Sequence, residues 1–234
     1  MTASTTLVPA LMLLAGMLLG NAIGRTSAQP SQVNQVAPSG IHRESGNRLP
    51  LINREALDEF GKLEYDEIQD DIRSGRMLAG LFGPVGIRLY SPRVSDGTLR
   101  SNLYLRFDSG IGRRTYELAV LVTARELNQQ FEWTAHEPAA VNAGVEQAVI
   151  DVVKYRRPVG ALAPRDALVI QLGREAFRTN TVGLKTFTEA VTLFGEKNLV
   201  DIVSVFGEYS SMAVLLNVFD QHLRDTQTPL LPVQ

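Results

Sequence analysis

Apolar residues recur at helical spacing through most of the chain after residue 52. Leu99, Leu103 and Phe107 follow one another at four-residue intervals, which places them on one side of a helix. No stretch alternates apolar and polar residues for long enough to predict a strand. The pattern therefore predicts an all-α fold. The other predicted helical segments are residues 53–60, 65–74, 116–127, 131–143, 145–155, 164–177, 181–194 and 199–219.

The last of these segments, residues 199–219, is the longest and is strongly apolar. It also contains Asp201 and Glu208 together with Ser210 and Ser211, which makes it too polar for a membrane span. We therefore predict that it forms the central helix of the core. Residues 77–90 include three glycines and a proline, and this composition predicts an irregular connection.

The N-terminal residues 7–23 are apolar and uncharged, and the small residues Thr26, Ser27 and Ala28 follow. This pattern predicts a signal peptide over residues 1–28, cleaved after Ala28, and a periplasmic or secreted protein. No Lys or Arg precedes the apolar stretch, and its length is close to the minimum of about 17 residues for crossing a bilayer. An uncleaved N-terminal anchor is therefore the alternative.

Composition divides the rest of the chain into three parts. Residues 29–50 are rich in Ser, Gln, Asn, Gly and Pro, which predicts a flexible linker. Residues 51–225 form the predicted helical domain, and residues 226–234 a loose tail. The formal net charge of -2 does not suggest nucleic acid or an anionic membrane surface as a partner. The chain has no cysteine, which excludes disulfides, thiolate nucleophiles and cysteine metal sites.

Glu132 and His136 are the clearest candidates for catalytic chemistry. Their four-residue spacing places both side chains on one face of a helix, about one turn apart. A carboxylate next to an imidazole can orient the ring for general acid or base catalysis near neutral pH. A pair on an exposed helix surface is the alternative. The neighbouring Trp133 indicates that the pair is partly buried.

Several motifs occur in order along the chain. RTYELAVLVTAREL at residues 114–127 is followed by FEWTAHEPAA at 131–140 and AGV at 143–145, with FGEKNLVDIV, GEY and LLNVF between residues 194 and 219. Together they resemble the carboxymuconolactone decarboxylase and alkylhydroperoxidase D-like family, and the resemblance covers roughly residues 53–219. It implies an alkylhydroperoxidase D-like helical bundle that assembles through its helices into a homodimer or larger ring.

The peroxidase branch of this family uses a CxxC pair with a histidine and an upstream glutamate as a proton relay. Matched to this sequence, the glutamate is Glu117 and the histidine is His136, while the two cysteine positions hold Gln129 and Glu132. The resemblance therefore implies no thiol peroxidase activity. It implies instead the cofactor-free acid–base chemistry of the decarboxylase branch, on a small lactone or unsaturated carboxylic acid. A metal held by Glu117, Glu132 and His136 is the alternative, although two carboxylates and one histidine are a generic set.

In this hypothesis His136 transfers the proton, Glu132 orients and charges the ring, and Glu117 is a second relay. We expect the three side chains to converge at a largely apolar pocket. Trp133, Tyr209 and Arg125 are candidates for substrate binding, Arg125 because its guanidinium offers two parallel donors to a carboxylate. A core tyrosine and an internal salt bridge are the alternatives for Tyr209 and Arg125.

For the chain as a whole, the alternative to an enzyme is a non-catalytic protein of the same fold that binds a small molecule or acts as a scaffold. Burial separates the two hypotheses. Glu132 and His136 on the wall of a closed pocket favour an enzyme, whereas exposure to bulk solvent favours the alternative.

Overall fold

The structure, a computed structural model, describes residues 40–77 and 79–232. Over these residues it contains nine α-helices and no strand, which confirms the predicted all-α class. The predicted signal peptide and the linker residues 29–39 lie outside the described part. The helices are α1 (Glu59–Arg73), α2 (Pro84–Arg88), α3 (Pro92–Leu103), α4 (Gly112–Glu126), α5 (Gln130–Asn142), α6 (Gln147–Lys154), α7 (Pro164–Thr179), α8 (Leu184–Phe194) and α9 (Glu196–Val218), with a 3-10 turn at Arg54–Ala56 and a π-helical turn, η2, at Tyr104–Asp108.

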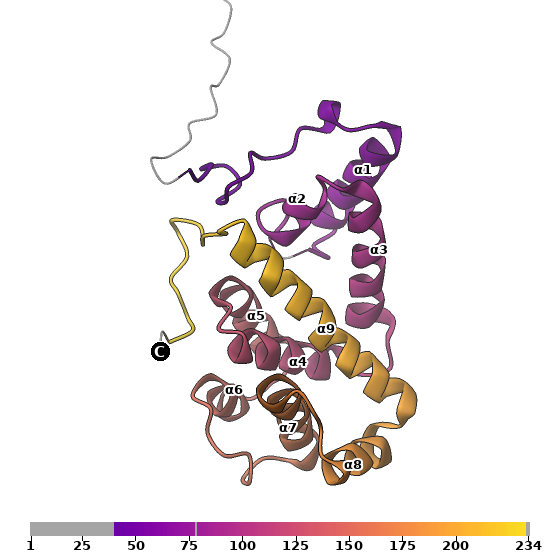
Figure 1. The fold of residues 1–234 in the computed structure, drawn as a ribbon, viewed down its shortest axis with the longest axis vertical. Coiled ribbons are helices and arrows are strands. Elements are labelled where there is room, and N and C mark those ends of the chain that lie inside the picture. The colour runs from indigo at the N-terminus through magenta and orange to yellow at the C-terminus, as the bar shows by residue number, and fades with distance from the viewer. Residues whose placement is uncertain (1–39, 78, 233–234) are drawn as a thin grey trace, which may run out of the picture. The chain divides into compact units, whose positions relative to one another are not determined.

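α4 lies at the centre of the core, where it packs against α5, α7 and α9 (Figure 1). Every side chain from Tyr116 to Arg125 is buried. A helix that is apolar on most sides needs partners around its whole circumference, and the three neighbouring helices supply them. Glu117 and Arg125 are buried along with the apolar residues, so each of these charged groups needs a polar partner inside the protein.

α7 approaches α4 closely because Gly173 has no side chain. A Cβ atom at this position would lie 2.3 Å from Cγ1 of Val122 and 3.3 Å from the ring of Phe206. A larger residue therefore cannot be accommodated without moving α4, α7 or α9.

α9 runs along α4 and also contacts α8, α2 and α3 (Figure 1). Ile202, Val205 and Leu216 are among its buried residues, as expected for the predicted central helix of the core. Within the described part of the chain it is also the one helix long and apolar enough to cross a membrane, although half of that stretch is buried inside the protein.

Polar residues of α3 and η2 face the interior together with part of the predicted apolar stripe, of which Leu99 and Leu103 are partly buried. Ser95, Asn102 and Arg106 are buried, whereas Phe107, which the spacing predicts to pack inward, is 43% exposed. The prediction is wrong for Phe107 because the polar side chains have buried partners: Ser95 donates to Glu64 (2.9 Å) and Asn102 to a buried tyrosine. The ring of Phe107 lies instead against the guanidinium groups of two arginines.

Both ends of the described chain pack against the helices. Asn47 Nδ2 donates to Oε1 of Gln221 (2.8 Å), so residues 40–50 are attached to the segment that follows α9. The predicted flexible linker is therefore wrong for residues 40–50, whose amide groups find partners there. The predicted loose tail is wrong at Leu231, which is 5% exposed and belongs to the main core cluster.

Candidate active site

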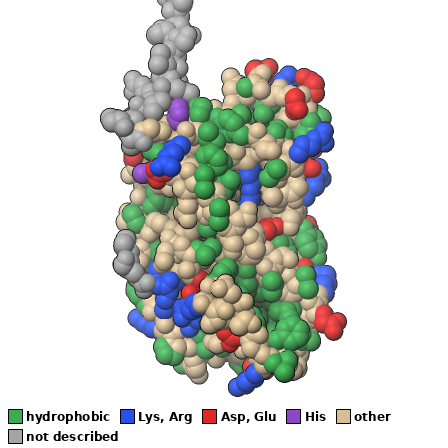
Figure 2. All heavy atoms as spheres, in the orientation of Figure 1, with side chains coloured by type: hydrophobic (Ala, Val, Ile, Leu, Met, Phe, Trp, Pro, Cys, Tyr) green, Lys and Arg blue, Asp and Glu red, His purple; other side chains and the backbone are tan. Residues whose placement is uncertain are grey.

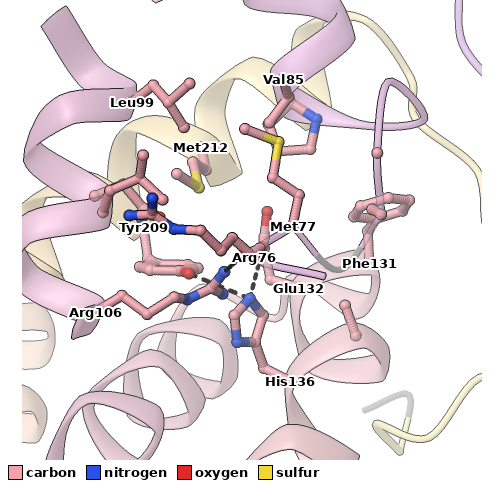
Figure 3. Close-up of a pocket in the computed structure, with 16 residues that line it drawn as sticks. Arg76, Met77, Val85, Leu99, Arg106, Phe131, Glu132, His136, Tyr209 and Met212 are labelled. Carbon is pink, nitrogen blue, oxygen red and sulfur yellow. Dashed lines mark hydrogen bonds and ion pairs between the residues drawn. The ribbon is translucent and has the colours of Figure 1, made fainter. Parts of the chain in front are cut away.

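A small cavity of about 70 Å³ lies between α3, α5, α9 and the segment that leads into α2. Most of its wall is apolar, and Figure 3 shows Leu99 and Met212 on the far side from His136. The volume is well below the roughly 300 Å³ of a site for a drug-sized ligand, so only a small ligand fits. The polar residues of the wall are Arg76, Asn102, Arg106, Glu132, His136 and Tyr209.

α4 and α5 bring Glu117 and His136 together. Oε2 of Glu117 lies 2.7 Å from Nδ1 of His136, and both side chains are almost fully buried. Oε1 lies 2.8 Å from Nη2 of Arg113, one helical turn earlier. Burial on its own raises the pKa of Glu117, but His136, Arg106 and Arg113 together lower it below its ordinary value. Glu117 is therefore a carboxylate at neutral pH, and Nδ1 of His136 donates to it.

Glu132 lies at the other nitrogen of the same ring. Its Oε2 is 3.5 Å from Nε2 of His136, and its Oε1 is buried without a hydrogen-bond partner. Burial raises the pKa of the Glu132 carboxyl above its ordinary value. The two glutamates thus have opposite environments, because only Glu117 is in contact with a cationic side chain. Glu117 is closer to the His136 ring than Glu132 is. The distances therefore indicate that Glu117, and not Glu132 as predicted, orients the ring.

Two buried tyrosines continue the contacts from Nε2 of His136. Tyr209 Oη lies 3.2 Å from this nitrogen and 2.8 Å from Oη of Tyr116. Asn102 Nδ2 donates to Tyr116 (3.1 Å). Burial raises the pKa of both phenols above the ordinary value, so each keeps its proton at neutral pH.

The hydrogen bonds that connect Asn102 to Glu117 through the two tyrosines and His136 all run in one direction. With Nδ1 of His136 donating to Glu117, Nε2 can accept, and the Tyr209 hydroxyl donates to it. Tyr116 accepts from Asn102, which leaves its own proton for Tyr209. Nε2 is therefore the hydrogen-bond acceptor of the His136 ring, and contacts on both sides hold the ring in place.

Arg106 is a buried residue of the site that the sequence pattern does not predict. It lies in η2, and π-helical turns are frequent at functional sites. Its Nη1 donates to the carbonyl of Arg76 (3.2 Å), while its Nε is buried without a partner. Figure 3 shows its guanidinium pointing toward the cavity, beside His136 and Glu132.

Trp133 and Arg125 do not line the cavity, so the prediction of substrate binding is wrong for both. Trp133 follows Glu132 by one residue, about 100° around the helix, and its fully buried indole donates to a glutamate one turn later. Arg125 lies two turns beyond Glu117 on α4, about 12 Å along the axis. It donates to Oδ1 of Asn128 (3.2 Å).

Glu117, Glu132 and His136 come together without the geometry of a metal centre. In the described ranges, no three His, Asp or Glu side chains form a group that could hold an ion. The two glutamates contact opposite nitrogens of the His136 ring, and a histidine offers an ion one nitrogen at a time. His136 therefore lies within reach of both glutamates, as predicted, but only His136 and Glu132 line the cavity, and Glu117 lies behind the ring.

The sequence carries a clear signal for only part of this site. Glu132 and His136 are recognisable from their spacing, whereas Asn102, Arg106 and Tyr116 give no signal, because helices far apart in the chain bury them. No protein-family model matches the chain, and a search of the curated proteins finds no match. The chemistry of the site is therefore the basis on which a function is proposed.

Proposed function

We propose that this protein is a cofactor-free acid–base enzyme, a decarboxylase, isomerase or hydrolase, that acts on a small lactone or unsaturated carboxylic acid. The observation that carries the proposal is the buried series Glu117–His136–Tyr209 at a small, mainly apolar cavity. The proposal includes an alkylhydroperoxidase D-like helical bundle, similar to carboxymuconolactone decarboxylase, and a periplasmic or secreted location.

His136 is the group that accepts and returns the proton. Glu117 holds the ring through Nδ1, which leaves Nε2 as the acceptor that faces the cavity. When a substrate displaces the Tyr209 hydroxyl from Nε2, this nitrogen can take a proton from a carbon atom activated by a neighbouring carbonyl, and the adjacent Glu117 carboxylate stabilises the imidazolium that forms. The same nitrogen then delivers the proton to another carbon or to the leaving group.

Glu132 is the complementary acid. It is buried, no cation contacts it, and its raised pKa favours the neutral carboxyl group. A carboxyl group that stays neutral near pH 7 can donate to a substrate oxygen on which negative charge develops. Two carboxyl groups whose environments move their pKa values apart are a common arrangement of acid and base in one site.

A non-catalytic binding or scaffold protein is the alternative, and burial favours the enzyme. Glu132 and His136 are only 3% and 4% exposed, and both lie on the cavity wall. Burying ionisable side chains costs stability, and a scaffold gains nothing from that cost.

Thiol peroxidase chemistry is excluded because the chain has no cysteine. Gln129, at the position of the first thiol in the peroxidase branch, has a structural contact instead. Its side chain accepts from the backbone N of Phe131 (3.0 Å) and donates to Asn217 on α9 (2.8 Å).

The proposal predicts exchange of a carbon-bound proton with solvent. Purified protein would be incubated in D₂O with a panel of small lactones and unsaturated carboxylic acids, and followed by NMR for consumption or deuterium uptake. At least one compound should react or exchange because His136 shares its proton with bulk solvent between turnovers. The matched control is the His136→Ala variant. A panel in which the wild-type protein and this variant behave identically would contradict the proposal.

The proposal also includes a homodimer, and the exposed face of α9 is the surface that fits it. Val200, Val203, Val214 and Val218 are each at least half exposed. Figure 2 shows mainly uncharged atoms along the course that α9 follows in Figure 1. The solvent-facing side of a surface helix is ordinarily charged, so an uncharged stripe of this length fits a covered surface.

A second copy of α9 is the occupant that matches this stripe. The outer valines, at 200 and 218, and the inner ones, at 203 and 214, lie at nearly equal distances from its middle, where Gly207 and Ser211 are exposed. Two antiparallel copies would therefore place valine against valine and small residues at the crossing point. This self-complementarity is what a two-fold symmetric interface requires.

The double substitution Val203→Lys and Val214→Lys is expected to convert the dimer to a monomer, because it places like charges opposite each other at the centre of the interface. Light scattering coupled to size exclusion measures the mass at micromolar concentration. Val94→Lys on α3, which is similarly exposed outside the stripe, should leave the dimer intact. A wild-type protein that is monomeric under these conditions would contradict the dimer.

A further inference from the structure

Arg106 is the buried cation of the cavity that lacks a counter-ion. It is 7% exposed, and in the described part of the chain it forms no ion pair with a carboxylate. Its polar contacts are with the carbonyl of Arg76 and the side chain of Tyr116, whose ring lies 5.4 Å from the guanidinium. These partners are neutral, and burial alone disfavours the charged form, so an anion beside the guanidinium would stabilise it further.

Among the described residues, no carboxylate is in ion-pair contact with Arg106. Glu117 is in contact with Arg113 and His136 instead. Glu132 lies on the cavity wall, and burial raises the pKa of its carboxyl group although His136, Arg106 and Arg88 act to lower it. A carboxylate in the cavity would therefore supply the anionic partner that the Arg106 guanidinium does not have.

The guanidinium of Arg106 lies on the cavity wall, beside His136 and Glu132 in Figure 3. Its Nε is buried and has no hydrogen-bond partner, so the hydrogen-bonding capacity of the group is not filled. A guanidinium presents parallel N–H groups that match the two oxygens of a carboxylate. On the other side the cavity wall is apolar, with Leu99 and Met212, which suits the hydrocarbon part of such a ligand.

We infer that Arg106 binds the carboxylate of a small monocarboxylate in this cavity and holds its adjacent carbon atoms beside Nε2 of His136. The cavity of about 70 Å³ restricts the ligand to a short carbon chain. The inference deepens the proposed function by identifying the substrate as an anion bound through its carboxylate. It rests on that function only for the statement that the bound anion is turned over.

Binding of acetate and propionate, each compared with its neutral amide, tests the subsite without any assay of turnover. Affinities would be measured at pH 7 and constant ionic strength from the concentration dependence of the melting temperature, which rises with ligand bound to the folded state. The wild-type protein should bind each carboxylate at least about tenfold more tightly than the amide, because charge-assisted hydrogen bonds are roughly twice as strong as neutral ones. Equal affinity for carboxylate and amide would overturn the inference.

Variants locate the binding group. Arg106→Gln should lose the preference for the carboxylate, and Arg106→Lys, which keeps the charge but not the paired donors, should retain part of it. Arg174→Gln is the matched control, because Arg174 donates to backbone carbonyls of Val152 and Arg157 outside the cavity. Equal carboxylate affinity in the Arg106→Gln and Arg174→Gln variants would overturn the inference, even if acetate binds. Carboxylate binding through Arg106 without any proton exchange would instead contradict only the proposed function.

Discussion

Replacing His136 with alanine is expected to lower turnover at least about 100-fold on a substrate found by the exchange screen. The His136 ring is the group that contacts Glu117, Glu132 and Tyr209 together. Its loss therefore removes the base and leaves the three other side chains without a common partner. General acid–base catalysis contributes about 10²–10⁴-fold to a rate, and the lower end of that range sets the expectation. The measurement is kcat for loss of the carbon-bound proton.

His222 provides the matched control for this prediction. Its side chain is 55% exposed and lies beside Asp220, beyond the end of α9. The His222→Ala variant should therefore keep wild-type turnover. His136→Gln retains an amide that can donate to Glu117, and it should be as inactive as the alanine variant. Full turnover by either His136 variant would contradict the mechanism.

Most helices of this protein are predictable because they have an apolar period and end signals of their own. α7 begins at Pro164 and α8 ends before Gly195, and both boundaries follow the usual positions of proline and glycine. α2 is assigned by the sequence to an irregular connection, because five residues are too few to show a period. α1 begins at Glu59 after a separate 3-10 turn at Arg54–Ala56, whereas the sequence predicts a helix that starts at Asn53.

The site is predictable within one helix and not between helices. The pairing of Glu132 with His136 follows from their spacing, while the contact of His136 with Glu117 joins two helices and is expected only from the family resemblance. Trp133 is next to Glu132 in the sequence but does not line the cavity, because consecutive residues of a helix face different directions. Arg106 could not be predicted as a site residue, because an arginine on an exposed helix and an arginine beside a cavity have the same local sequence pattern.

Glu117→Gln and Glu132→Gln are expected to change stability in opposite directions near neutral pH, although both remove activity. Glutamine has nearly the same shape as glutamate and cannot ionise, so each variant isolates the effect of the charge. The reason for the difference is the environment of each carboxyl group. Glu117 is in contact with Arg113 and His136, whereas one oxygen of Glu132 has no partner at all.

The pKa of Glu117 is lowered in the folded protein, because His136, Arg106 and Arg113 outweigh burial. Its charge therefore stabilises the fold above the unfolded pKa of about 4.3, and this contribution is lost as the pH falls through the folded pKa. Removing one partner of a buried ion pair typically costs about 3–5 kcal/mol. Glu117→Gln should lose stability of this order at pH 7 and much less at pH 3.

Burial raises the pKa of Glu132, so its contribution to stability changes with pH in the opposite direction to that of Glu117. The neutral carboxyl group is favourable below the unfolded pKa, and that contribution is lost as the pH rises through the folded pKa. Glu132→Gln avoids this loss, so its stability relative to the wild-type protein should increase as the pH rises. Urea unfolding of both variants from pH 3 to pH 9 measures the two trends. If Glu132→Gln instead lost stability steadily toward high pH, as Glu117→Gln should, Glu132 would be a buried carboxylate and not the neutral acid of the site.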